Sequence, residues 1–244
     1  MAASGTAAAM IKALRARAEP DRIDVLQSFF RTAPREYGEG DRFIGVRVPA
    51  VRTLVRRFAA ASRADIDALL ASPIHEARLL AVLLLVHQFK TAPDDAARRG
   101  VFEFYLSRTT RINSWDLVDV SAPAVVGGWL AGRGRARLRT LARSRELWDR
   151  RIAIVATHYF IRRGDLDDTF RIADLLLADD GQDLIHKAVG WMLREAGKRD
   201  GQALRRFLAS RHTRMPRTML RYAIEKFPEG ERRRYLRGRA GRTT

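Results

Sequence analysis

Trp115 and Asp119 are the two residues whose types and spacing best suit chemistry. A helix starting here would have Asn113 or Ser114 as its cap and Asp116 in its first turn, where the helix dipole favours a carboxylate. Trp115 and Asp119 would then lie four residues apart on one face. An electron-rich indole and a carboxylate on one surface can together stabilise a developing positive charge. The alternative is structural, an ion pair between Asp119 and one of the many arginines nearby.

A second distinctive segment lies further along the chain. Lys187, Trp191 and Arg194 fall at i, i+4 and i+7, which places a basic and aromatic stripe on one helical face. The alternative treats Trp191 as a core residue and the flanking charges as a solvated face. Comparable positions of neighbouring helices carry further cations: Arg151, Arg217 and Arg221.

The charge balance predicts a polyanionic partner. The chain has 46 Lys and Arg against 28 Asp and Glu, a formal net charge of +18 and a sequence pI near 11.3. Such an excess is common in proteins that bind nucleic acid, and an anionic membrane surface is the other candidate. The basic segment 232–237 could serve a membrane, but it has no matching apolar face.

The apolar pattern and the lack of cysteine predict the compartment. The longest apolar stretch, around 79–86, ends at His87, so we expect no membrane span. Residues 1–18 are rich in alanine but contain three basic residues and no compact apolar segment with a cleavage site. The absence of Cys excludes disulfides and thiol catalysis and agrees with a reducing compartment. We expect a soluble, cytoplasmic protein, associated with the nucleoid if the source is bacterial.

Apolar positions at spacings of three and four residues predict helices along the whole chain. The segment 43–49 could be one short strand, but no second strand pattern would pair with it. We interpret it as an extended entry into a helix with Pro49 at its start. The helices expected are 7–18, 22–31, 49–61, 63–72, 75–90, 94–107, 114–131, 135–144, 147–163, 165–178, 182–198, 200–210, 215–227 and 229–237.

The later helices form pairs that repeat. The first helix of successive pairs opens with a basic residue, namely Arg78, Arg151, Lys187 and Arg217, at separations of 73, 36 and 30 residues, of which 73 is close to two periods. Helix pairs of this length without a tetratricopeptide or ankyrin consensus predict an all-α, HEAT-like α-solenoid of about six helix pairs. Such a stack usually offers a concave face, so a concave basic groove is expected. We expect a monomer with an N-terminal extension (1–20), a repeat domain (21–238) and a tail (239–244).

Three segments together carry a resemblance to a known family. They are Ser114-Trp115-Asp116-Leu117-Val118-Asp119, Trp148-Asp149-Arg150-Arg151-Ile152-Ala153, and Lys187-Ala188-Val189-Gly190-Trp191-Met192-Leu193-Arg194-Glu195. In this order and spacing, the chain from about residue 20 to residue 230 resembles the AlkD family of DNA alkylation repair proteins, which are HEAT-like-repeat DNA glycosylases.

The resemblance implies a role for each site residue. Asp119 matches the catalytic aspartate, Trp115 and Trp191 match the tryptophans that bracket the deoxyribose of the lesion, and Arg151 and Arg194 match arginines of the DNA backbone contact and the active site. The chain departs from the best-known members at Arg47-Val48, where they carry small polar side chains before the proline. The lesions accepted are therefore left open. The other DNA contacts expected are Lys187, Arg217, Arg221 and Arg47.

The chemistry of an alkylated purine fits these residues. A purine alkylated at N3 or N7 is already cationic and leaves without protonation, so no general acid is required. We expect a monofunctional glycosylase that acts on duplex DNA, and the resemblance implies that it leaves the base stacked. We expect no metal and no cofactor, because the five histidines are scattered. The alternative is a non-catalytic scaffold that binds nucleic acid or an acidic protein with the same groove.

Overall fold

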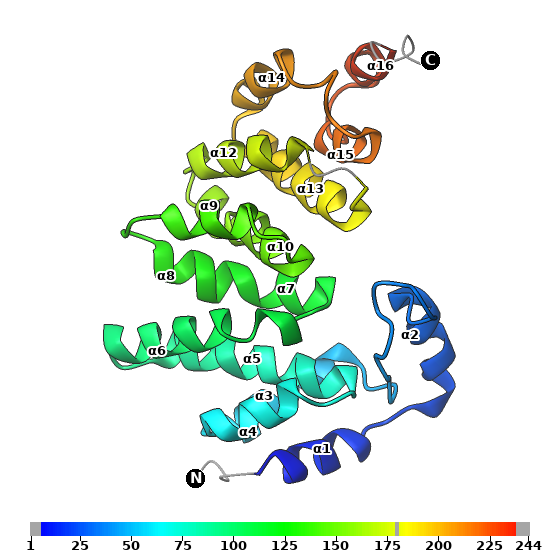
Figure 1. The fold of residues 1–244 in the computed structure, drawn as a ribbon, viewed down its shortest axis with the longest axis vertical. Coiled ribbons are helices and arrows are strands. Elements are labelled where there is room, and N and C mark those ends of the chain that lie inside the picture. Colours follow the sequence, from blue (N-terminus) through cyan, green and yellow to red (C-terminus); the bar gives the residue numbers. More distant parts are fainter. Residues whose placement is uncertain (1–5, 179–180, 238–244) are drawn as a thin grey trace. The chain divides into compact units, whose positions relative to one another are not determined.

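The computed structural model describes residues 6–178 and 181–237, and within these ranges the chain is helical and contains no strand. It forms two compact units, Met1–Val125 and Val126–Thr244. Each unit is built from helices that pack in pairs (Figure 1). The predicted all-α fold of helix pairs is confirmed.

The first unit is organised around helix α5 (His75–Thr91), which packs against α3, α4, α6 and α7. From Ala77 to Leu85 every residue of α5 is buried. A helix that is apolar on all sides must be covered on all sides, which explains its central place. Among the described residues, no helix is both long and apolar enough to cross a membrane. The other helices of this unit are α1 (Ala7–Arg15), α2 (Ile23–Phe30), α3 (Val48–Arg57), α4 (Arg63–Leu70), α6 (Asp95–Leu106) and α7 (Trp115–Ala122).

The second unit is organised around α13 (Asp183–Arg199), which packs against α10, α12, α14 and α15. Gly190 allows the close approach of α15, because a Cβ there would lie 2.5 Å from the carbonyl oxygen of Met219. The other helices are α8 (Gly128–Leu130), α9 (Ala136–Ala142), α10 (Leu147–Ala156), α11 (His158–Ile161), α12 (Asp167–Leu175), α14 (Gly201–Ala209), α15 (Arg217–Ala223) and α16 (Glu229–Arg237).

Two helices predicted as continuous are interrupted. The predicted helix 114–131 consists of α7, a π-helical turn over Pro123–Gly127, and the short α8. Pro123 explains the break, since it lacks an N–H group and its ring clashes with the preceding turn. The predicted helix 147–163 is divided into α10 and α11 at Thr157, whose hydroxyl donates to the carbonyl oxygen of Ile154 at 2.6 Å.

The segment before α3 follows the sequence prediction. Arg42 forms an isolated parallel bridge with Ile74, residues 43–47 have no regular secondary structure, and α3 begins at Val48. Near the N-terminus, α1 buries Met10 and Leu14 and packs against α4 and α5. The predicted division into an extension, a repeat domain and a tail stays a prediction, and the tail 239–244 lies outside the described residues.

Candidate functional site

Trp115 is the first residue of α7, and Asp119 follows one turn later. Both side chains are half-buried, and their spacing places them on the same side of the helix, as the sequence predicts. Asp119 lies close enough to Tyr105 to act on it electrostatically. Burial raises the pKa of the Tyr105 hydroxyl, and the negative charge of Asp119 adds to that rise. Tyr105 therefore stays a neutral neighbour of the Asp119 carboxylate.

The helix α7 begins where the sequence predicts, but the polar side chains at its start form other contacts than a cap hydrogen bond. Ser114 is the N-cap, but its side chain forms no cap hydrogen bond, and within the described part of the chain its hydroxyl has no hydrogen-bond partner. Asn113 instead accepts a hydrogen bond from Arg78. Asp116 does lie in the first turn, yet it also accepts from Nε2 of His75 at 2.9 Å. The predicted positions of Ser114 at the N-cap and Asp116 in the first turn are confirmed, while the side chains of Asn113 and Asp116 find partners on α5.

Trp115 is held by aromatic residues from α2 and the loop that follows it. Its ring stacks on Phe30, with centroids 5.1 Å apart and planes 10° apart, and it meets Phe29 edge-on at 5.8 Å. Its Nε1–H donates to the hydroxyl of Tyr37 at 3.2 Å. Phe29 is 64 % exposed and Trp115 is half-buried, so this cluster of aromatic side chains reaches the protein surface.

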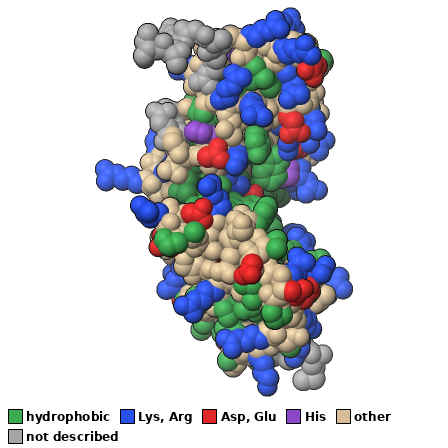
Figure 2. Space-filling view, turned by 90° about the vertical axis from the view of Figure 1, so that its right-hand side faces the viewer, with side chains coloured by type: hydrophobic (Ala, Val, Ile, Leu, Met, Phe, Trp, Pro, Cys, Tyr) green, Lys and Arg blue, Asp and Glu red, His purple; other side chains and the backbone are tan. Residues whose placement is uncertain are grey.

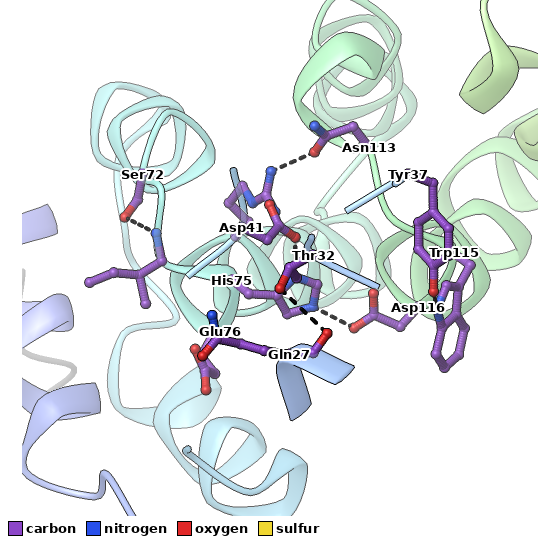
Figure 3. A network of polar contacts seen from close by, with 12 residues as sticks. Gln27, Thr32, Tyr37, Asp41, Ser72, His75, Glu76, Asn113, Trp115 and Asp116 are labelled. Carbon is purple, nitrogen blue, oxygen red and sulfur yellow. Dashed lines mark hydrogen bonds and ion pairs between the residues drawn. The ribbon is translucent and has the colours of Figure 1, made fainter. Parts of the chain in front are cut away.

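A buried charged network lies behind Trp115 (Figure 3). His75 is 2 % exposed, and its Nδ1 lies 2.8 Å from Oδ2 of Asp41 while its Nε2 contacts Asp116. Asp41 also pairs with Arg78. Burial opposes the charged imidazolium, but the hydrogen bonds to Asp116 and Asp41 outweigh that effect and raise the pKa of His75 to about 9. His75 is therefore an imidazolium at neutral pH, and both of its N–H groups donate to carboxylates.

Glu76 fixes the segment 43–47 before α3. Its buried carboxylate accepts hydrogen bonds from the backbone N–H groups of Ile44, Gly45 and Val46 at 2.9 to 3.2 Å. Gly45 has φ of +83°, and a Cβ there would lie 2.1 Å from the carbonyl oxygen of Glu19. A sequence signal for this network exists, namely three ionisable residues (His75, Glu76 and Arg78) at the start of the most apolar helix.

The predicted stripe of the second unit lies on α13. Trp191 is half-buried, and its ring is 5.8 Å from that of His158, whose pKa is lowered by burial. Lys187 forms an ion pair with Asp183 one turn earlier, at 2.7 Å. Arg194 pairs with Glu225 of the segment after α15 and with its neighbour Glu195. The structure thus places the three predicted residues on one helix and gives both cations carboxylate partners.

The other predicted DNA contacts differ in exposure. Arg151 is 5 % exposed and donates to the carbonyl oxygen of Leu184 at 2.6 Å, so it ties α10 to α13. Arg217 and Arg221 are exposed on α15, and Arg217 donates to the carbonyl oxygen of Leu236. In the first unit, Arg47 is exposed and pairs with Glu19 at 2.9 Å.

The charges on the face drawn in Figure 2 are spread rather than gathered. Figure 2 shows Lys and Arg side chains dispersed over one face of the molecule, with acidic and hydrophobic side chains among them. No group of three or more potential metal ligands occurs in the ranges 6–178 and 181–237.

The fold and the site define a class: a protein of helix pairs with a carboxylate and an indole one turn apart on a helix, and an excess of cations over the whole chain. The sequence matches the family described as DNA alkylation repair enzyme over residues 10–227. The chain therefore belongs to this AlkD-like family of DNA alkylation repair enzymes, which confirms the resemblance seen in the sequence.

One solved structure resembles the chain in fold. It is described as a predicted DNA alkylation repair enzyme from Enterococcus faecalis, with 15% sequence identity and a TM-score of 0.66. The match covers 87% of this chain and 98% of that one. At this identity the likeness concerns the fold alone. No protein with a curated description matches the chain.

Proposed function

We propose that the protein is a monofunctional DNA glycosylase that excises cationic N3- and N7-alkylated purines from duplex DNA. The observation that carries this proposal is the pair Trp115 and Asp119 on α7, in a chain that belongs to a family of DNA alkylation repair enzymes. A carboxylate opposes the binding of phosphates, so its place in a strongly basic DNA-binding protein makes sense if it faces a positive charge that develops during a reaction.

The proposed reaction is a hydrolysis. The bond between C1′ and the purine nitrogen breaks, its electron pair leaves with the base, and the cationic purine becomes neutral. Positive charge moves to the sugar, where the Asp119 carboxylate and the face of Trp115 stabilise it. Water then adds to C1′ and loses a proton. His75 is unsuited to act as a general acid, since both of its nitrogens are occupied by carboxylates in a buried position.

The second unit supplies further contacts in this proposal. Trp191 is proposed as the second aromatic residue at the sugar, and Lys187, Arg194, Arg217 and Arg221 as contacts to DNA. Arg47 is a proposed contact as well, whereas Arg151, which is 5 % exposed, is proposed to act through the packing of α10 against α13. Because Arg47, Lys187 and Arg194 already pair with carboxylates, binding requires these ion pairs to exchange a carboxylate for a phosphate. The base is proposed to stay stacked.

A release assay tests the proposal. The purified protein should release 7-methylguanine and 3-methyladenine from duplex DNA but not uracil or hypoxanthine, which are poor leaving groups without protonation. Release of uracil would contradict the lack of a general acid. Tight DNA binding without release of any alkylated purine would instead favour the non-catalytic scaffold.

A further inference from the structure

The start of α5 and the start of α7 are joined through a column of rings and charges. The His75 ring stacks on Phe43 at 4.5 Å, Phe43 lies 4.8 Å from Phe30, and Phe30 stacks on Trp115 at 5.1 Å. On its polar side, His75 bonds directly to Asp116, the residue after Trp115. The position of Trp115 is thus tied to His75 both through packed rings and through a hydrogen bond.

This link depends on an imidazolium. A neutral imidazole has one N–H group and could donate to only one of the two carboxylates, leaving the other buried carboxylate facing a ring nitrogen that carries a lone pair. Because an unpaired charge in the interior is costly, loss of the proton should separate His75 from Asp41 or from Asp116. Asp41 belongs to the loop that carries Tyr37, and Asp116 belongs to α7.

The charged groups around His75 come from three elements. The loop contributes Asp41, α7 contributes Asp116, and α5 itself contributes Glu76 and Arg78. The neighbours from α2 and the segment 43–47 are the uncharged Phe30 and Phe43. Arg78 opposes protonation of His75, but it is already paired with Asp41, and the two carboxylates in direct contact favour protonation. The loop also carries Arg42, whose carbonyl oxygen accepts from the backbone N–H of His75 at 2.8 Å, and Tyr37, which bonds to Trp115.

We propose that His75 is a positioning residue of the excision reaction: held between Asp41 and Asp116, it fixes the start of α7 against the Tyr37 loop and thereby sets the orientation of Trp115 and Asp119. This inference rests on the proposed function. It predicts that excision has an upper pH limit set by His75, although His75 touches neither the sugar nor the base.

A pH series measures the inference directly. The 15N signals of His75 should report an imidazolium at pH 7.5 that loses its proton near pH 9. The single-turnover rate of 7-methylguanine release, corrected for uncatalysed loss at each pH, should fall with the same midpoint and then by about tenfold per pH unit. The variant Asp116→Asn removes one of the two charges that stabilise the imidazolium, so the alkaline limb should move to lower pH.

A matched control separates positioning from general damage to α5. His87 is half-buried on the same helix and lies outside the network, so His87→Gln should keep the wild-type rate and pH profile. The variant His75→Gln should lower the rate at every pH and abolish the alkaline limb. If His75→Gln does not fold, the shifted limb of Asp116→Asn still decides the question.

Two results would overturn the inference. The first is an excision rate that stays constant while the His75 signals titrate. The second concerns a protein that releases no alkylated purine. In that case the proposed function is refuted, and the link between His75 and Trp115 is measured without the reaction. The indole N–H signal of Trp115, assigned with Trp115→Phe, should then shift with the midpoint of His75, and an indole signal that ignores His75 would refute the link.

Discussion

The two tryptophans proposed for the site stand in contrasting surroundings. Trp115 is fixed by a stacked Phe30, by a hydrogen bond to Tyr37 and, through Asp116, by a charged histidine. Trp191 has a neighbouring histidine too, but burial lowers the pKa of His158, so that ring is neutral where His75 is charged. The cations beside Trp191 pair with half-exposed or exposed carboxylates of their own unit.

This difference suggests a division of labour. Groups that must stabilise a transition state act best when their positions are fixed in advance, and the buried network provides that around Trp115. Groups that bind a phosphate backbone must exchange one anion for another, and partly exposed ion pairs of this kind are weak enough to exchange. We infer that α7 supplies most of the chemistry, with Trp191 as the second aromatic residue, and that the cations of α13 and α15 supply mainly affinity.

The largest expected effect is that of Asp119→Asn. If the carboxylate stabilises the sugar cation, this change should lower the single-turnover excision rate by about 10²- to 10³-fold. Affinity for duplex DNA should stay the same or improve slightly, because a negative charge is removed from a phosphate-binding surface. Rate, affinity and melting temperature should be measured on the same preparation.

The same variant tests whether Asp119 has a chemical or a structural role. A structural role for Asp119 predicts a lower melting temperature with little specific loss of rate. Full excision activity in a well-folded Asp119→Asn protein would contradict the assignment of the chemistry to α7.

The second effect concerns stability at alkaline pH. The pKa of His75 is raised from 6.5 to about 9 on folding, so its stabilising contribution is fully present below pH 6.5 and is lost as pH rises through 9. Its size is on the order of 3 kcal/mol. Unfolding by denaturant between pH 6 and pH 10 should show this loss in the wild type and not in His75→Gln. The lowered pKa of His158 has the opposite sign and disfavours the folded state as pH falls.

The third effect is that of Trp191→Ala, which should lower both the excision rate and the melting temperature. An aromatic face contributes roughly 1–2 kcal/mol to a nearby cation, so the rate should fall by about 5- to 30-fold. The control is Trp129→Ala, another half-buried tryptophan of the second unit, whose ring lies under Arg133. Equal losses of rate in the two variants would mean that Trp191 acts through stability alone.

The sequence predicted the helices well, because their apolar spacing is dictated by local periodicity and by clear Gly and Pro boundaries. The spacing of Trp115 and Asp119 was equally predictable, since it depends only on the pitch of one helix. Pro123 in the sequence already indicated the break that ends α7. Local rules were therefore sufficient to predict the helices and the relative positions of residues within one helix.

The network behind Trp115 could not be predicted in this way. It joins Asp41, His75 and Asp116, which are more than thirty residues apart, and no spacing rule links such positions. Local rules allowed Asn113 or Ser114 as the cap, and Ser114 is the N-cap, but they gave no sign that Asn113 bonds to Arg78. The sequence also gave no sign that Arg151 is buried, because its burial follows from the packing of α10 against α13.

The smallest effect concerns the salt dependence of binding. If about five phosphates are neutralised, log K should fall with log salt with a slope of roughly −4 to −5. Lys187→Ala or Arg217→Ala should weaken binding to all sequences alike and make that slope shallower by about one unit. The ion pair of Lys187 offers a sharper variant, since Asp183→Asn removes the carboxylate that competes with DNA for this lysine. Asp183→Asn should strengthen binding while leaving the excision rate at saturating protein unchanged, because it touches affinity and not chemistry. A slope near zero in the wild type would refute phosphate binding by these cations. A changed rate in Asp183→Asn would contradict the assignment of Lys187 to affinity alone.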